Sequence, residues 1–186
     1  VQWGETAPAR AHMEQAVEGY TAAGDHHAAA QASGHLASLL FTMGEWEDAR
    51  ALFLRSLSDL RRIGDLRAAG LISASLGNLR RAMGEEAEPL YAEALDAMVA
   101  VGDLPGEAQI LDLMGSMFLD RDSPNEAEEH FRRALAMHRT GDDSRIFEEV
   151  TTTIENVYRE MCARFQQLHS FCQHRTGAMR ILPSLD

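Results

Sequence analysis

The stretch from Gly64 to Val101 reads GDLRAAGLISASLGNLRRAMGEEAEPLYAEALDAMVAV. It opens on a Gly-Asp pair and carries two segments with apolar residues at helical spacing, which Gly84 separates. Similar stretches open on Gly-Asp pairs at residues 24, 102 and 141, so that the successive spacings are 40, 38 and 39 residues. Self-similarity at such a period predicts a solenoid in which each repeat is a pair of helices.

Composition limits the classes of function. The chain has 186 residues, of which 45% are hydrophobic, and this is enough for one sizeable core or one short solenoid. The formal net charge of −12 argues against nucleic acid and against anionic membranes as partners. The sequence has no apolar run long enough to span a membrane and no signal peptide. All 17 basic residues are arginines, which indicates a GC-rich, bacterial genome.

The sequence contains no motif that indicates catalysis or a cofactor. It lacks a phosphate-binding loop, a Gly-x-Ser-x-Gly elbow and a His-Glu-x-x-His pair. Cys162, His169, Cys172 and His174 lack the tight spacing of a zinc site, and the two cysteines do not form a disulfide framework. We therefore expect no enzymatic activity, no metal and no cofactor, and free thiols in a cytoplasmic protein.

The second segment of each stretch follows one rule. A small residue is followed four positions later by a large one. Another small residue stands three positions after the large one, and an apolar residue follows it directly. The small residues are Ala9, Ala49, Ala87 and Ala127, and the large ones are Met13, Phe53, Tyr91 and Phe131. Small residues let helices approach closely, so the rule predicts that Phe53, Tyr91 and Phe131 are wedges in the core between repeats.

This pattern resembles the tetratricopeptide repeat, a helix-turn-helix unit. The resemblance covers about residues 9–161. It rests on Leu76-Gly77, Gly84, Ala87, Tyr91 and Ala94, on Leu36, Gly44, Trp46, Ala49 and Phe53, and on Met114-Gly115, Ala127, Phe131 and Ala134. The departures are Ala37, Ser56, Asp122 and a short turn after Gly84. The long period, opened by Gly-Asp, is similar to a subtype in sensor domains of bacterial transcription regulators, in polarity adaptors and in kinesin light chains.

The resemblance implies an all-α fold, a right-handed solenoid of stacked antiparallel helix pairs. We expect a single domain with a half repeat at 9–23, full repeats at 24–63, 64–101 and 102–140, a degenerate repeat and long capping helix at 141–175, and a tail at 176–186. The half repeat has no first helix before it. We therefore expect the face formed by Ala9, Met13, Ala16 and Val17 to drive homodimerisation or to be covered by residues 1–8, with Trp3 as the lid.

In the tetratricopeptide family the first helix of each pair lines a concave groove, and the residue after the Leu-Gly pair points into it. The implied groove residues are His35, Ser38, Leu71, Ser75, Asn78, Arg81, Asp112, Leu113, Ser116, Leu119, Asn156 and Arg159. Asn78 and Asn156 offer both a donor and an acceptor to the backbone of a bound peptide. The alternative is that Asn78 forms a hydrogen bond within its own helix pair.

Two functions remain open at this point. The first is a scaffold that binds a peptide or a helix of a partner protein in the concave groove. The second is a ligand- or peptide-sensing domain of a larger bacterial transcription regulator. The net charge of −12 favours a basic or neutral peptide. The lysine-dependent capture of chaperone tails, known for one class in this family, is excluded because the chain has no lysine.

Overall fold

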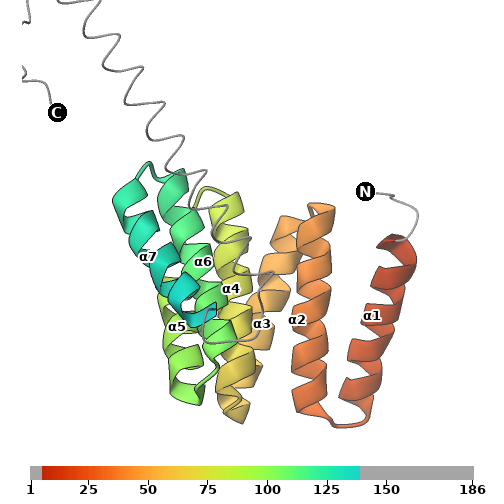
Figure 1. The fold of residues 1–186 in the computed structure, drawn as a ribbon. Helices are drawn as coiled ribbons and strands as arrows, with labels where there is room; N and C mark the ends of the chain where they lie inside the picture. The colour runs from red at the N-terminus through yellow and green to blue at the C-terminus, as the bar shows by residue number, and fades with distance from the viewer. Residues whose placement is uncertain (1–5, 139–186) are drawn as a thin grey trace, which may run out of the picture.

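The computed structural model describes residues 6–138, and every regular element in this part of the chain is an α-helix. Successive helices pack side by side in a row from α1 to α7 (Figure 1). The expectation of an all-α array of stacked antiparallel helix pairs is confirmed, whereas the expected capping helix at 141–175 lies outside the described residues. The helices are α1 (Thr6–Ala22), α2 (His26–Met43), α3 (Trp46–Ile63), α4 (Leu66–Ala82), α5 (Glu88–Val101), α6 (Leu104–Asp120) and α7 (Pro124–His138).

The helices form the pairs α2–α3, α4–α5 and α6–α7. We call α2, α4 and α6 the first helices, and α3, α5 and α7 the second helices. By its residue pattern α1 is a second helix too, and it packs against α2, the first helix of the next pair.

The Gly-Asp pairs at residues 24, 64 and 102 form turns, each between a second helix and the following first helix. Gly64 ends α3 in the left-handed conformation, at φ +87°, which glycine adopts without steric cost. Asp65 then caps α4, because its Oδ1 accepts a hydrogen bond from the backbone N–H of Ala68 at 2.9 Å. The same cap joins Asp25 to Ala28 at 3.0 Å and Asp103 to Gly106 at 3.0 Å.

The second carboxylate oxygen of a capping aspartate links one repeat to the preceding one. Asp65 Oδ2 lies 2.7 Å from Nε2 of His27, and Asp103 Oδ2 accepts a 2.6 Å bond from Nε of Arg67. His27 and Arg67 each stand two residues after the previous capping aspartate. The Ala68 N–H and the contact with His27 lower the pKa of Asp65 below its usual value. We call these inter-repeat contacts the aspartate ladder.

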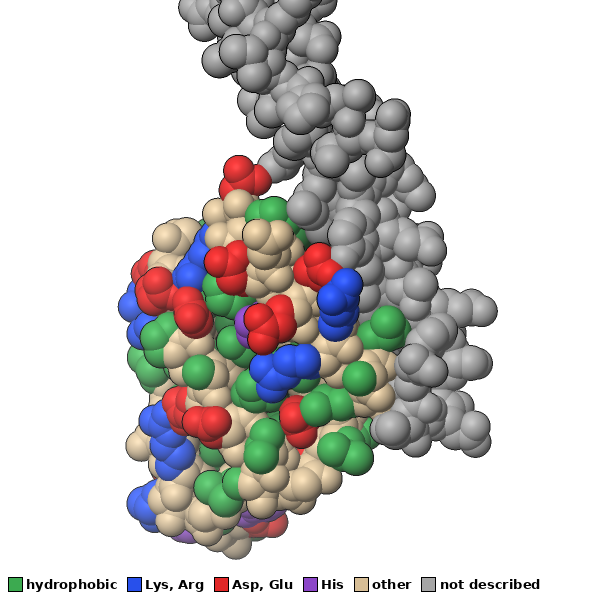
Figure 2. Space-filling model, turned by 60° about the vertical axis from the view of Figure 1, so that its left-hand side comes forward, with side chains coloured by type: hydrophobic (Ala, Val, Ile, Leu, Met, Phe, Trp, Pro, Cys, Tyr) green, Lys and Arg blue, Asp and Glu red, His purple; other side chains and the backbone are tan. Residues whose placement is uncertain are grey.

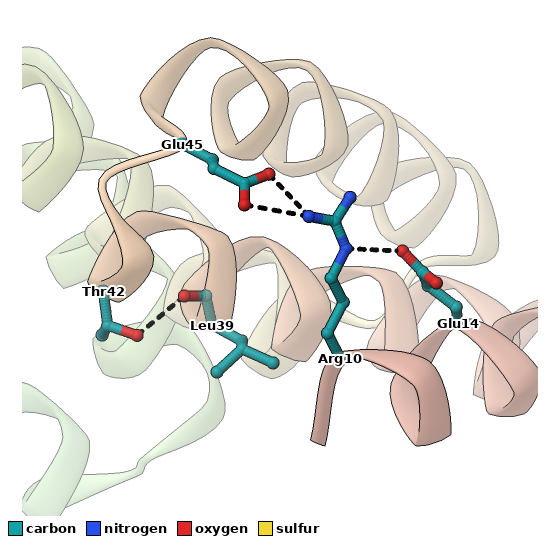
Figure 3. A network of polar contacts seen from close by, with 5 residues as sticks. All are labelled: Arg10, Glu14, Leu39, Thr42 and Glu45. Atoms are coloured by element: carbon teal, nitrogen blue, oxygen red, sulfur yellow. Dashed lines mark hydrogen bonds and ion pairs between the residues drawn. The ribbon is translucent and has the colours of Figure 1, made fainter. Parts of the chain in front are cut away.

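A second set of ion pairs joins the helix pairs at the opposite turns. Arg10 on α1 donates to both carboxylate oxygens of Glu45 at 2.9 and 2.8 Å, and also to Glu14 (Figure 3). One repeat later Arg50 donates to Glu85 at 3.0 Å, and after that the charges are exchanged, with Arg121 donating to Glu88 at 2.7 Å. Exposed pairs of this kind contribute little to stability individually.

The predicted wedges lie in the core. Phe53, Tyr91 and Phe131 are buried, and the ring of Tyr91 packs so closely on Gly77 of α4 that a Cβ there would lie 2.8 Å from it. Met98, one further buried side chain of α5, lies between two first helices. A Cβ added at Gly70 of α4 would lie 2.6 Å from its Cε, and one added at Gly106 of α6 would lie 2.6 Å from its Sδ.

The turns inside the pairs explain two departures from the repeat pattern. Asp122 occupies the position held by Gly44 and Gly84 in the other pairs, with φ at +57° against +83° and +74°. Aspartate is one of the few residues that adopt this region with a side chain. The turn after Gly84, expected to be short, is a longer connection in the structure: residues 83–87 join α4 to α5, whereas residues 44–45 join α2 to α3. The second helix α5 therefore begins only at Glu88 and has 14 residues, against 18 in α3.

The terminal face expected at the half repeat is partly covered by the chain itself. Ala9, Met13, Ala16 and Val17 are half-buried, and Met13 and Val17 pack against the core that includes α2. The proposed lid, Trp3, lies outside the described residues. Homodimerisation through this end of the molecule stays a prediction.

The contact between Gly77 and Tyr91 can be tested by a substitution that adds a single methyl group at Gly77. We expect Gly77→Ala to destabilise the fold by about 1–3 kcal/mol, because the buried ring must move to admit the Cβ. Gly19→Ala on α1 is the control, since a Cβ there meets nothing within 4 Å, and it is expected to stabilise by roughly 0.5–1 kcal/mol. Urea denaturation measures both, and equal effects of the two substitutions would contradict the close packing.

Candidate functional site

The first helices form a continuous layer of the molecule. α2 contacts α4, and α4 contacts α6, whereas no comparable contact joins α3 to α5 or α5 to α7 in the described residues. The candidate groove residues His35, Ser38, Leu71, Ser75, Asn78, Arg81, Asp112, Leu113, Ser116 and Leu119 are all on these helices, and Asn156 and Arg159 lie outside the described part of the chain. The layer therefore brings side chains of three successive repeats to one side of the array.

The three candidate serines of this layer are half-buried and form hydrogen bonds within their own helices. Ser38 donates to the carbonyl oxygen of Gly34 at 3.1 Å, Ser75 to that of Leu71 at 2.9 Å, and Ser116 to that of Asp112 at 2.9 Å. A hydroxyl that donates to the residue four positions earlier still has lone pairs that can accept. The serines therefore remain possible acceptors for a ligand, but their protons are already used.

Asn78 differs from the serines because its hydrogen bond crosses to the second helix. Its Oδ1 accepts a 2.7 Å bond from the hydroxyl of Tyr91 on α5. The sequence left open whether Asn78 forms a hydrogen bond within its own helix pair. Its carboxamide oxygen does so. Among residues 6–138 the Nδ2 amide group of Asn78 forms no hydrogen bond. The side chain is half-buried, and its two N–H groups are the donors that it retains for a ligand.

Arg81, three residues after Asn78, forms an ion pair across the first-helix layer. Its Nε donates to Asp120 Oδ2 at 2.5 Å, which joins the end of α4 to the end of α6, and the contact with Asp120 contributes to raising the pKa of Arg81. Burial raises the pKa of Tyr91, while the nearby Arg81 guanidinium acts in the opposite direction.

The pairing of Asn78 with Tyr91 follows the repeat pattern. In the other two pairs the wedge is phenylalanine, Phe53 or Phe131, and the residue at the position of Asn78 is Ser38 or Ser116. A wedge without a hydroxyl needs no acceptor in the first-helix layer. Asparagine occurs where tyrosine reaches that layer, because a hydroxyl buried without a partner costs free energy.

The apolar candidates lie on the same first helices, α4 and α6. Leu71 and Leu113 are half-buried and pack against the core cluster that contains Tyr91 and Met98. Leu119 and Asp112 are half-buried too, whereas His35 is exposed. The layer between α4 and α6 therefore combines partly exposed leucines with the amide donors of Asn78.

No group of three or more His, Cys, Asp or Glu side chains gathers at one point in residues 6–138, and none of the seven helices is long and apolar enough to cross a membrane. Cys162, His169, Cys172 and His174 lie outside the described residues.

The contacts that sequence reasoning missed are the inter-repeat ion pairs. One signal of the aspartate ladder is present in the sequence, because a basic residue follows two positions after Asp25 and Asp65. The third repeat has Pro105 at that position, so the described ladder has two steps.

Comparison with known families agrees with this geometry. Two sequence-family profiles, both described as tetratricopeptide repeat, match residues 29–63 and residues 67–140. These two stretches are tetratricopeptide repeats. Neither profile describes a catalytic domain, and tetratricopeptide repeats generally mediate protein–protein interactions.

The repeat fold also appears among solved structures. The crystal structure of BtubC (BKLC) from P. vanneervenii matches with a TM-score of 0.73, over 98% of this chain and 80% of the other. The two sequences are 18% identical, so this likeness concerns the fold. No curated protein sequence matches the chain.

The coupling between Tyr91 and Asn78 can be measured by a double-mutant cycle. Tyr91→Phe leaves the carboxamide oxygen without its donor, and we expect a loss of roughly 0.5–1.5 kcal/mol in the free energy of unfolding. The double variant Tyr91→Phe, Asn78→Ser reproduces the phenylalanine–serine pair of the neighbouring repeats. It is expected to cost less than the sum of the two single variants. Strict additivity in urea denaturation would contradict the coupling.

Proposed function

We propose that the chain is a protein-interaction module that binds a peptide or a helix of a partner along the first-helix layer. The single observation that carries the proposal is the hydrogen bond that Asn78 accepts from Tyr91. Its carboxamide oxygen is held by the hydroxyl of Tyr91, so the amide group keeps two donors in a fixed orientation. Such a group suits a backbone carbonyl, which is present in every peptide irrespective of sequence.

The neighbouring side chains support a peptide as the ligand. Leu71 and Leu113 are partly exposed on successive first helices, so side chains that flank the bonded carbonyl can bury apolar area on them. Ser116 adds acceptor lone pairs to this surface. An amide donor between apolar side chains is the arrangement expected of a site that fixes the backbone of a ligand and buries its side chains.

Charge favours a basic or neutral partner. The net charge of −12 repels acidic chains over long range, and Asp112 lies in the proposed surface. On the face shown in Figure 2, acidic and arginine side chains are interspersed with apolar ones. Steering of a partner would therefore come from the net charge rather than from one patch on that face.

The alternative function, a sensing domain of a bacterial transcription regulator, rests on the long Gly-Asp-opened period. A peptide or small ligand would occupy the same first-helix layer in that case. The two functions differ in what is attached to the module and not in the surface that we propose.

A selected peptide tests the proposed surface. A neutral peptide is first obtained from a displayed library by binding to the full chain, and its affinity is then measured for variants. Asn78→Asp keeps an acceptor for Tyr91 but removes the two amide donors, and is expected to weaken binding by about 1–3 kcal/mol. Leu113→Gln is expected to weaken it as well, through lost apolar burial.

The matched control is Leu54→Gln, which changes an exposed leucine of the second helix α3. We expect it to leave the affinity unchanged, and all three variants to keep their helical circular dichroism. If Leu54→Gln weakens binding and the two first-helix variants do not, the ligand binds elsewhere.

A further inference from the structure

The two steps of the aspartate ladder have the same geometry but a different basic side chain. At the second step Arg67 Nε donates to Asp103 Oδ2 at 2.6 Å, and at the first step His27 Nε2 lies 2.7 Å from Asp65 Oδ2. An arginine in a protein keeps its charge, whereas a histidine ordinarily gains or loses its proton between about pH 5 and pH 8. The equivalent positions therefore hold one permanent cation and one that depends on pH.

The carboxylate of the first step is held in place independently of His27. Its Oδ1 accepts the hydrogen bond from the backbone N–H of Ala68 at 2.9 Å, and the Asp65 side chain is only 23% exposed. The Ala68 N–H, and after it the contact with His27, lower the pKa of Asp65 below its usual value. Asp65 therefore stays ionised across the whole pH range in which a histidine ordinarily titrates.

The imidazole of His27 has a second neighbour on its own helix. The amide nitrogen of Gln31, one turn later on α2, lies 3.4 Å from the same Nε2 that faces Asp65. A protonated imidazole donates from Nε2 to the carboxylate, whereas a neutral one without a proton on Nε2 can only accept there, from the Gln31 amide. The side chain thus has one arrangement that joins two repeats and one that lies within α2.

The other charged side chains at this edge of the array do not replace the proton on His27. The arginines of α3 and α4 nearest the turn have partners of their own: Arg61 with Glu93, Arg62 with Asp59 and Arg67 with Asp103. At the start of α2, Asp25 accepts the cap bond from Ala28. His26 and Glu18, the last charged residue of α1, are exposed, and among residues 6–138 neither side chain forms a hydrogen bond or an ion pair.

We propose that the contact between His27 and Asp65 is a pH-sensitive joint between the first two repeats. With His27 protonated, an ion pair joins the start of α2 to the turn before α4, in addition to the packing of these two first helices. Loss of the proton removes this charge and leaves Nε2 able to accept from Gln31. The contribution of His27 is therefore present on the acidic side of its titration and is lost as the pH rises, whereas that of Asp65 is lost only in more acidic solution, when its carboxylate is protonated.

A double-mutant cycle between His27→Ala and Asp65→Asn tests the joint at about pH 5.5 and about pH 8.5. Asparagine keeps the cap of α4 but removes the charge. Urea denaturation gives the equilibrium constant of unfolding for the four chains, and pH effects of distant groups cancel in the cycle. At the lower pH we expect a coupling of about two- to fivefold in this constant, as for an exposed ion pair, and at the higher pH a coupling close to one.

The second step of the ladder is the matched control. The cycle between Arg67→Ala and Asp103→Asn is expected to give the same coupling at both pH values, because the guanidinium stays charged. His27→Arg copies that step into the first position, and its coupling with Asp65 is expected to become independent of pH. A coupling between His27 and Asp65 that is absent at the lower pH, or equal at both, would overturn the proposal. So would an arginine cycle that changes with pH as much as the histidine cycle does.

Discussion

The structure depends on the packing of α3 and α5, each of which lies between two first helices. Met98 of α5 contacts Gly70 on one side and Gly106 on the other, and the ring of Tyr91 packs closely against Gly77. Two features of the sequence make this possible: small residues where backbones approach, and one large residue that fills the remaining space. Each of these two helices has a first helix on both sides, and therefore the repeat only becomes stable as part of an array.

Polar contacts specify the stacking register of the helices, which apolar packing alone does not determine. Similar helices could stack in more than one register, and the ion pairs distinguish these registers because the correct one joins Arg10 to Glu45 and Arg50 to Glu85. In the third of these ion pairs the acidic and basic positions are interchanged, because Glu88 takes the place of the arginine and Arg121 that of the glutamate. The third pair therefore differs from the first two. The hydrogen bond from Tyr91 to Asn78 belongs to the same class of contact, since it satisfies a hydroxyl that the wedge brings to the first-helix layer.

The sequence predicts the parts of this structure that repeat, and it predicts poorly the parts that differ between repeats. The period and the buried positions of Phe53, Tyr91 and Phe131 follow from in-phase residues and local helix geometry. The partner of Asn78 could not be decided from the sequence, because it depends on where the hydroxyl of Tyr91 emerges. The ladder from His27 to Asp65 joins residues 38 positions apart, and such a pair requires the stacking register before it can be seen.

Hydrogen exchange of the native chain tests most directly the claim that burial between two first helices determines the stability of a second helix. The account predicts that backbone amides in the middle of α5 exchange slowest, with an opening free energy near that of global unfolding. Amides in the middle of α1, which packs against α2 alone among the described helices, are predicted to open with a clearly lower free energy. Equal protection of α1 and α5 would show that cover on one side is enough, and would contradict the account.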